Sequence, residues 1–194
     1  MPKVTEEHKE NMRRKIRRSA KKLFLEKGFR AVTMKDIVTA SELSFGAVYS
    51  YYSNTSDIFL KLKEEEMSAD QEDYQRIFNA ISKSAIIEDY LVFLTKRLAN
   101  IHETLIPATY DYLTYVEKGT HHNEISEIVY KQIDEQLQGF FQQTELVKEE
   151  EIINITAFLA VYVEGLYFQQ AFIEKPATEK SLESLRYLLN KLLL

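Results

Sequence analysis

The sequence predicts an all-α protein of about nine helices, and three observations support this. Its 194 residues include only five Gly and three Pro, so long stretches lack the residues that most often interrupt a helix. Apolar residues recur at intervals of three and four along most of the chain, which is the period of an amphipathic helix. No stretch alternates apolar and polar residues as a half-buried strand would, and no internal repeat is present.

The first helix is predicted from about Glu7 to Lys27. Gly28 follows it in the position where a helix commonly ends. One face is apolar and carries residues at i, i+4, i+7 and i+8: Ile16, Ala20, Leu23 and Phe24. The other faces carry a dense basic cluster: Arg13, Arg14, Lys15, Arg17, Arg18, Lys21 and Lys22.

Two short helices and a tight turn are predicted between residues 33 and 49. Thr33 can cap the first helix, with Asp36 in the reciprocal position of a capping box. Ser44 can cap the second, which continues to about Tyr49. This arrangement is typical of the helix-turn-helix, whose second helix enters the major groove of DNA.

A long fourth helix is predicted over residues 55–80. Asn54 can cap it, and Asp57 favours a helix N-terminus electrostatically. We therefore expect a three-helix DNA-binding domain over residues 1–54 and a helical domain over residues 55–194, with helix 55–80 as the connector. The remaining helices are predicted at residues 86–105, 108–118, 124–144 and 149–173, and from Thr178 or Ser181 to the end, with Pro107 and Pro176 as breaks.

The charge is divided unevenly along the chain. Residues 1–57 carry 12 Lys or Arg and 7 Asp or Glu, whereas residues 58–194 carry 13 and 23. A basic beginning on an acidic body indicates that the first part alone meets an anionic polymer such as DNA. The alternatives are chance surface charge and, for the first helix, a merely solvated basic face.

Other classes of protein fit the composition poorly. There is no Cys, so neither a disulfide framework nor a thiolate metal site is expected. The longest uninterrupted apolar run, Ala157–Val163, is too short to span a membrane, and the basic N-terminus does not read as a signal peptide. We expect a cytoplasmic protein without a membrane partner.

Three separated segments resemble the N-terminal domain of TetR-type transcriptional regulators. They are residues 20–29 (AKKLFLEKGF), 33–37 (TMKDI) and 44–52 (SFGAVYSYY), and the resemblance covers about residues 10–62. The opening residues 2–9 are also similar to those of some Bacillus members with unassigned ligands. The resemblance implies a homodimeric repressor whose C-terminal domain binds a small-molecule effector and dimerises, so that effector binding releases a palindromic double-stranded DNA operator.

The resemblance and the basic first helix together define a set of candidate DNA contacts. Phosphate contacts are expected from the first helix, from the start of the second helix and from the start of the fourth. The remaining residues would face the groove or its rim. The full set is Arg13, Arg14, Arg17, Thr33, Lys35, Ser44, Phe45, Gly46, Ala47, Tyr49, Tyr51 and Thr55.

Two positions depart from the family pattern, with Glu42 in place of the usual turn Gly and Thr55 in place of a Lys. The predicted recognition helix also contains no Arg, Lys, Asn or Gln, the side chains that make the strong bidentate base contacts. We hypothesise that operator choice depends on A·T-rich shape and on thymine methyls that pack against Ala47 and Val48, with Arg13, Arg14 or Arg17 contributing. A strict guanine requirement contacted by residues 44–51 would contradict this.

The C-terminal two-thirds is rich in aromatic residues, most of which belong to a helical core. A cluster of them also suits a pocket for a flat or cationic ligand, which Glu103, Asp111 and Glu164 could balance. The candidate pocket residues are Tyr90, Phe93, His102, Tyr110, Tyr112, Tyr115, Tyr130, Phe158 and Tyr162.

Helix 149–173 is apolar nearly all round in its second half. It is either a central core helix or part of a four-helix bundle between two copies, and we favour the dimer because a helix-turn-helix usually binds DNA in pairs. The candidate interface residues are Phe158, Tyr162, Leu166, Phe168, Leu182, Leu185 and Leu189.

Two rival functions were weighed. A helical metal-dependent enzyme would need His102, His121 and His122 to converge on one ion, and adjacent histidines in a loop chelate poorly. We therefore expect no enzyme, no metal site and no cofactor. The second rival is a helix-turn-helix regulator controlled by a protein partner, which a C-terminal domain without a cavity would favour.

Overall fold

The computed structural model describes residues 5–78, 82–115, 138, 141 and 148–193, and within these ranges it contains helices and no strand. The α-helices are α1 (Glu6–Lys27), α2 (Met34–Ser41), α3 (Phe45–Tyr49), α4 (Thr55–Phe78), α5 (Lys83–Ala99), α6 (Ile106–Tyr115), α9 (Glu149–Phe172) and α10 (Thr178–Leu193), with a 3₁₀ helix, η1, at Ile101–Glu103. The all-α prediction is confirmed. The helix predicted at 124–144 lies outside the described residues, apart from Gln138 and Phe141.

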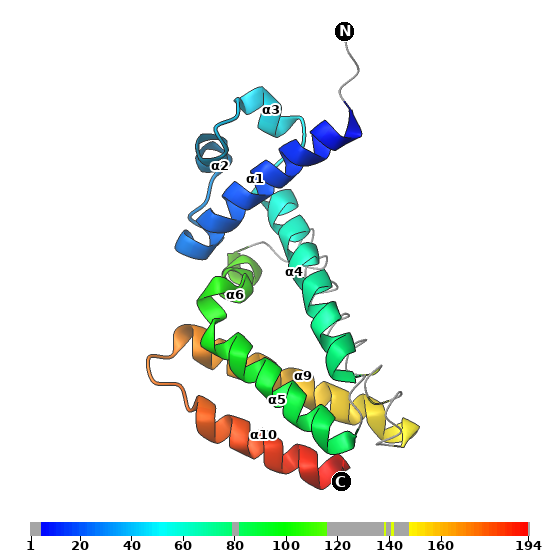
Figure 1. Cartoon of the computed structure of the whole chain (residues 1–194). Helices are drawn as coiled ribbons and strands as arrows, with labels where there is room; N and C mark the ends of the chain where they lie inside the picture. Colours follow the sequence, from blue (N-terminus) through cyan, green and yellow to red (C-terminus); the bar gives the residue numbers. More distant parts are fainter. Residues whose placement is uncertain (1–4, 79–81, 116–137, 139–140, 142–147, 194) are drawn as a thin grey trace.

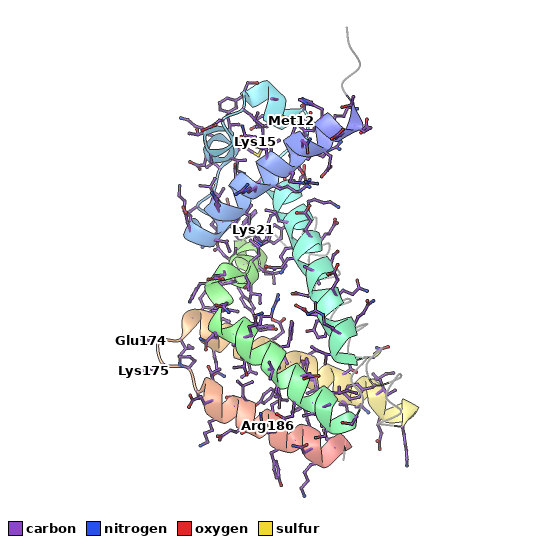
Figure 2. All side chains as sticks on the ribbon, in the orientation of Figure 1. Met12, Lys15, Lys21, Glu174, Lys175 and Arg186 are labelled. Atoms are coloured by element: carbon purple, nitrogen blue, oxygen red, sulfur yellow. The ribbon has the colours of Figure 1, made fainter. Side chains whose placement is uncertain are left out.

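The helices form an upper group and a lower layer joined by α4 (Figure 1). Helices α1, α2 and α3 gather around the start of α4, which then runs down to a layer of α5, α9 and α10. Helix α6 lies between the two groups. Across the lower layer Arg186 of α10, labelled in Figure 2, lies 2.9 Å from the carboxylate of Glu88 in α5.

The capping signals predicted for α2 and α3 are both used. The Thr33 hydroxyl accepts the Asp36 N–H at 3.2 Å while the Asp36 carboxylate accepts the Thr33 N–H at 2.9 Å, which completes the capping box of α2. The Ser44 hydroxyl accepts the Ala47 N–H at 3.2 Å and begins α3. Glu42, between them, has φ 55° and ψ 33°, so a non-glycine residue occupies the left-handed turn.

An aromatic cluster forms the centre of the N-terminal core. Phe29 lies 5.7 Å from Phe24, 5.1 Å from Phe59 and 4.6 Å from Tyr112, measured between ring centroids. These residues come from α1, the turn after it, α4 and α6. The core of the upper group is therefore completed by α6, a helix that the sequence assigned to the C-terminal domain.

The passage from α5 to α6 differs from the prediction. A continuous helix was expected to residue 105, but α5 ends at Ala99 and η1 follows. The Asn100 side chain donates to the Lys96 carbonyl at 2.9 Å and so occupies that helix end. The break directs Leu105, which is fully buried, into the N-terminal core, and Pro107 lies in the first turn of α6 as expected.

A buried ionic network that the sequence analysis missed joins α4 to the α5–α6 passage. Lys63 and Glu66 of α4 lie 2.8 Å apart with only 5% and 9% of their side chains exposed. Glu66 also accepts the Leu105 N–H at 2.8 Å, and Asp70 pairs with Arg97 of α5. Burial acts to raise the pKa of Glu66, but Lys63 and the Leu105 N–H outweigh it and lower that pKa, whereas burial raises the pKa of Asp70.

Helix α9 is apolar enough to merit comment. Residues Glu151–Phe172 have the length and the mean hydropathy, 1.4, of a helix that could cross a membrane, and 33% of an 18-residue stretch within them is buried in the protomer. One face of α9 packs against α5, α6 and α10. The rest of its apolar surface is exposed in the single chain.

Replacing Glu66 with Gln tests the buried network. The variant leaves Lys63 buried without its carboxylate, so the free energy of unfolding at pH 7 should fall by about 3 kcal/mol. Because the folded pKa of Glu66 lies below its usual value of 4.5, its ionised form contributes stability that is complete above that value and is lost as the pH falls through the folded pKa.

Urea unfolding of wild type and E66Q at several pH values measures this. The difference between the two should shrink on acidification below about pH 4.5. Glu64→Gln, which disturbs only the exposed pair with Lys61 in the same helix, is the matched control and should change stability by less than about 0.5 kcal/mol. Equal effects of E66Q and E64Q at pH 7 would contradict the account.

Candidate DNA-binding surface

Helix α3 is fixed on one side and open on the other. Val48 is fully buried beneath it, and Tyr52 just after it is 9% exposed. Ser44, Phe45, Gly46 and Tyr49 are exposed, and the Phe45 and Tyr49 rings stack with centroids 6.4 Å apart. An exposed pair of aromatic rings on a short, well-capped helix marks a surface for contact rather than for folding.

Gly46 adds an independent observation. A Cβ placed on Gly46 would meet no atom of the chain within 4 Å. Its backbone φ is also not in the left-handed region, where the structure places only Gly28 and Glu42 among the described residues. Neither packing nor backbone geometry therefore requires glycine here, and its backbone is open to close approach by a partner.

The other predicted contacts on this side are distributed around α3. Lys35 is exposed, and Thr33 is exposed with its hydroxyl engaged in the α2 cap. Ala47, Tyr51 and Thr55 are half-buried. Arg13 lies over the Tyr51 ring at 5.6 Å, a contact that the sequence analysis did not anticipate.

The basic face of α1 is mostly open. Arg14, Lys15, Arg18 and Lys22 are exposed, and Arg13 and Lys21 are half-buried. Lys15 and Lys21 can be followed on α1 in Figure 2. Their positive charge gives the N-terminal end of the chain the electrostatic character that phosphate binding needs.

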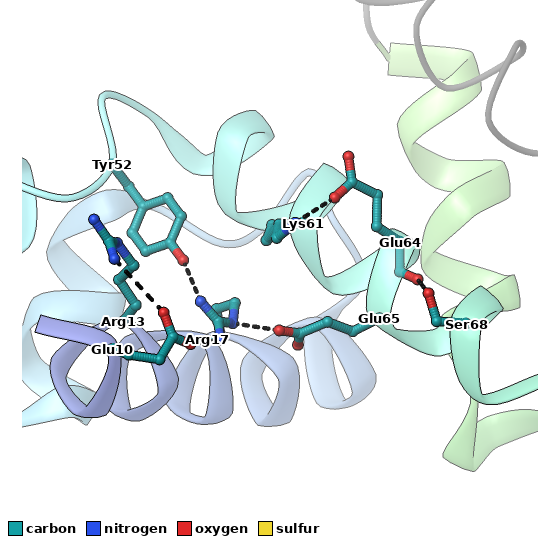
Figure 3. A network of polar contacts seen from close by, with 8 residues as sticks. All are labelled: Glu10, Arg13, Arg17, Tyr52, Lys61, Glu64, Glu65 and Ser68. Carbon is teal, nitrogen blue, oxygen red and sulfur yellow. Dashed lines mark hydrogen bonds and ion pairs between the residues drawn. The ribbon is translucent and has the colours of Figure 1, made fainter. Parts of the chain in front are cut away.

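Arg17 was placed wrongly among the phosphate contacts. It is only 6% exposed and lies inside a polar network (Figure 3). Its guanidinium donates to the Tyr52 hydroxyl at 2.9 Å and to Glu10 at 2.7 Å, and its Nε lies 2.7 Å from Glu65. Its position on α1 turns it toward Tyr52 and α4, so its charge is neutralised within the chain.

Base-reading hydrogen bonds from α3 are limited to hydroxyl groups. The Ser44 hydroxyl accepts the Ala47 N–H, and the Ser50 hydroxyl donates to the Ala47 carbonyl at 2.7 Å. Both serine hydroxyls are therefore already engaged in hydrogen bonds at the ends of α3. What the open face offers most is apolar surface and a close backbone, which suits methyl groups and groove shape.

The predicted pocket residues do not form one group. Tyr90 and Phe93 belong to the C-terminal core, and Tyr110 beside it donates to the carboxylate and carbonyl of Glu164. Tyr112 was assigned wrongly, because it is fully buried in the N-terminal core. The others lie elsewhere: Tyr115 is 56% exposed beside Arg30, Phe158 is 48% exposed, Tyr162 donates to the Ser181 carbonyl, and Tyr130 lies outside the described residues.

His102 lies in a different place from the aromatic core. It borders a cleft of about 280 Å³ between the end of α1, the start of α6 and the end of α9. Lys27, Asp111 and Phe172 line the same cleft. The Asp111 carboxylate accepts the Arg30 N–H at 2.7 Å, so it ties α6 to the DNA-binding unit.

The residues of the predicted dimer interface divide into two groups. Phe158 and Phe168 are 48% and 49% exposed, and Tyr162 and Leu182 are half-buried. Leu166, Leu185 and Leu189 were assigned wrongly to the dimer interface, because they are buried in the protomer's own core. Val161, which the sequence analysis left out, is 75% exposed.

The residues weighed as metal ligands are not brought together where they are described. No group of three His, Cys, Asp or Glu side chains suited to a metal occurs within the described ranges. His102 and Glu103 are exposed on η1, and His121 and His122 lie outside those ranges.

Comparison with known proteins addresses both the recognition unit and the whole fold. A family model described as bacterial regulatory proteins, tetR family, matches residues 16–62. Over 112 residues the chain is 38% identical to an uncharacterized HTH-type transcriptional regulator of Bacillus subtilis (strain 168), YfiR. That match covers 58% of this chain and spans 55% of the length of YfiR.

Solved structures share the fold at low identity. A TetR-family regulator from Agrobacterium tumefaciens has a TM-score of 0.74 at 11% identity, over 96% of this chain and all of that one. A putative TetR-family regulator from Syntrophomonas wolfei has a TM-score of 0.73 at 15% identity, over 94% and 95%. NalD of Pseudomonas aeruginosa has a TM-score of 0.67 at 17% identity, over 96% and 98%.

Replacing Gly46 with Ala separates folding from DNA binding. The added methyl meets open space in the free chain, and Ala favours a helix over Gly by about 1 kcal/mol, so the melting temperature should hold or rise. The same methyl stands where the DNA would approach, so DNA affinity should fall by about tenfold or more. Thermal melts and fluorescence anisotropy with a bound DNA duplex measure the two effects, and unchanged affinity would contradict the assignment.

Proposed function

We propose that the chain is a TetR-type transcriptional regulator, as its similarity to that family indicates, and that it is a homodimeric repressor that leaves a palindromic operator when a small molecule binds its C-terminal domain. The observation that carries the DNA-binding part is the open face of α3, where Gly46 is required by nothing inside the chain. We expect it to act in the cytoplasm and to have no enzymatic activity.

The proposal that the protein represses transcription, rather than activating it, rests on analogy. NalD, which shares the fold, is described as the secondary repressor of the MexAB-OprM multidrug efflux pump. A regulator that blocks transcription needs only to occupy DNA and to be released, and the fold provides a DNA-binding unit joined to a separate helical body. This is the simplest use of the arrangement in Figure 1.

The support for a small-molecule effector lies in the C-terminal core. Tyr74, Tyr90, Phe93 and Tyr167 gather around Arg97, whose guanidinium lies 6.0 Å from the Phe93 ring centroid and 5.9 Å from that of Tyr167. Aromatic side chains beside a cation, which here is paired with Asp70, suit a flat amphipathic molecule. Control by a protein partner is the second candidate, favoured if no such molecule alters DNA binding.

The support for a dimer is the exposed stripe on α9. Residues Phe158, Val161, Gly165, Phe168 and Phe172 recur at helical spacing on one face, and the four with apolar side chains are 48–75% exposed. We call this face the α9 stripe. Apolar surface of this extent favours a protein partner, and a second copy of the chain also provides the two-fold symmetry of a palindromic operator.

Selection from a random pool of double-stranded DNA, with the full-length chain at a stated salt concentration, tests the proposed function. The expected result is enrichment of one palindromic sequence, and repetition with candidate amphipathic effectors should reduce its retention. Enrichment of no palindrome would contradict the proposal.

Replacing Val161 with Glu tests the dimer. Val161 is 75% exposed, so the change should leave the protomer folded while placing two carboxylates against each other across the α9 stripe. Sedimentation should show a monomer, and affinity for the palindrome should fall on the order of 100-fold because the two recognition units are no longer linked. Val92→Glu on α5, at a position 64% exposed, is the matched control, and a dimeric V161E would overturn the assignment of this face.

A further inference from the structure

Arg17 of α1 contacts side chains from two other parts of the chain that are distant from it in the sequence. It lies in α1, Tyr52 follows α3, and Glu65 is in the third turn of α4 (Figure 3). The guanidinium donates to the Tyr52 hydroxyl at 2.9 Å and to the carboxylate of Glu10 in α1 at 2.7 Å, and its Nε forms an ion pair with Glu65 at 2.7 Å that lacks hydrogen-bond geometry. We call these four residues the Arg17 clasp.

Arg17 is buried much more deeply than the two carboxylates that it contacts. Only 8% of the Arg17 side chain is exposed, whereas Glu10 and Glu65 are each 44% exposed. A buried guanidinium has to keep its partners: its planar fork binds Tyr52 and Glu10 in fixed directions, and its charge attracts the Glu65 carboxylate. Arg17 therefore constrains where Tyr52 and Glu65 lie relative to each other.

The clasp is placed to sense the tilt of α4. Glu65 lies ten residues after the first residue of α4, which is about 15 Å along the helix axis. A tilt of about 10° around the start of α4 would therefore move Glu65 by roughly 3 Å. That displacement is about as large as the 2.7 Å distance between Arg17 and Glu65. The Arg17 clasp therefore cannot remain intact unless Arg17 or Tyr52 moves with α4.

Glu65 is able to leave the clasp without being trapped in apolar surroundings. A cleft of about 440 Å³ opens beside it, and six of its seven lining residues carry ionisable charges: Glu10, Arg13, Arg17, Asp57, Lys61 and Glu65, with Tyr52 as the seventh. The Lys61 ammonium is paired at 2.6 Å with the carboxylate of Glu64, the residue before Glu65 in α4. The carboxylate of Glu65 can therefore exchange Arg17 for water.

We propose that Arg17 is a positioning residue for DNA recognition, which makes the orientation of the recognition helix depend on the tilt of α4 by holding Tyr52 and Glu65 at the same time. The inference rests on the proposed function and adds a route by which a movement of α4 reaches α3. Arg17 acts through Tyr52 and not through contact with a DNA phosphate.

Charge and salt dependence distinguish positioning from phosphate contact. A lost phosphate contact lowers the slope of log affinity against log salt by about 0.9 for each site, whereas a misplaced recognition helix lowers affinity with little change in slope. Removing the Glu65 charge should by itself favour binding to anionic DNA. A loss of affinity in Glu65→Gln would therefore run against the simple charge effect.

The experiment measures operator affinity of the full-length dimer by fluorescence anisotropy between about 50 and 200 mM salt. The variants are Tyr52→Phe, which removes one hydroxyl, Glu65→Gln, Arg17→Gln and Arg17→Lys, which keeps the charge without the fork. The matched controls are Arg14→Gln, an exposed arginine on the same helix, and Glu64→Gln, the neighbour of Glu65. Circular dichroism at the assay temperature confirms that each variant is folded.

Y52F and E65Q should each weaken binding by about fivefold at fixed salt with an unchanged slope, and R17K should not restore wild-type affinity. Y52F should add nothing in the R17Q background. R14Q should lower the slope, and E64Q should not weaken binding. If R17Q does not fold, the operator affinities and salt slopes of Y52F and E65Q decide whether the inference holds.

Two results would overturn the inference while leaving the proposed function intact. One is a wild-type chain that binds its operator while Y52F and E65Q bind equally well. The other is a slope lowered by R17Q as it is by R14Q. A wild-type chain that binds no selected DNA would instead overturn the proposed function and this inference with it.

Discussion

The packing of Phe29 against Tyr112 is the contact on which the arrangement of the chain depends. Their ring centroids are 4.6 Å apart, and they join the turn after α1 to α6. The turn reaches this position because Gly28 has φ 74°, and a Cβ at Gly28 would approach the Asp111 carboxylate to 3.0 Å. The same carboxylate accepts the Arg30 N–H. The DNA-binding unit is thereby attached to α6 as well as to α4.

This attachment determines what α3 can do. Helix α3 packs on the core through its own Val48, with Tyr52 buried just after it, so Phe45 and Tyr49 on its other side stay exposed around Gly46. The absence of Arg, Lys, Asn and Gln from α3 then leaves methyl contacts and groove shape as its means of discrimination. In the proposed function, affinity comes from the basic face of α1 and from a second copy of the chain.

The sequence predicted those features that depend on interactions between residues close together in the chain. The capping residues Thr33 and Ser44 and the apolar stripe of α1 depend on neighbours within a few residues, and the structure confirms them. It did not predict the bond between Arg17 and Tyr52, which are 35 residues apart, or the burial of Tyr112 in the N-terminal core. A basic residue among six others reads as solvated until the partner that buries it is known.

The central claim is that α3 recognises DNA mainly through thymine methyl groups and groove shape. The most direct measurement is the affinity of the full-length chain for operators in which single thymines are replaced by uracil, which removes the methyl and leaves the hydrogen-bonding edge intact. At the positions beneath α3 each replacement should weaken binding by about fourfold, the value of one buried methyl group. Unchanged affinity at every such position, together with a strict requirement for guanine there, would contradict the account.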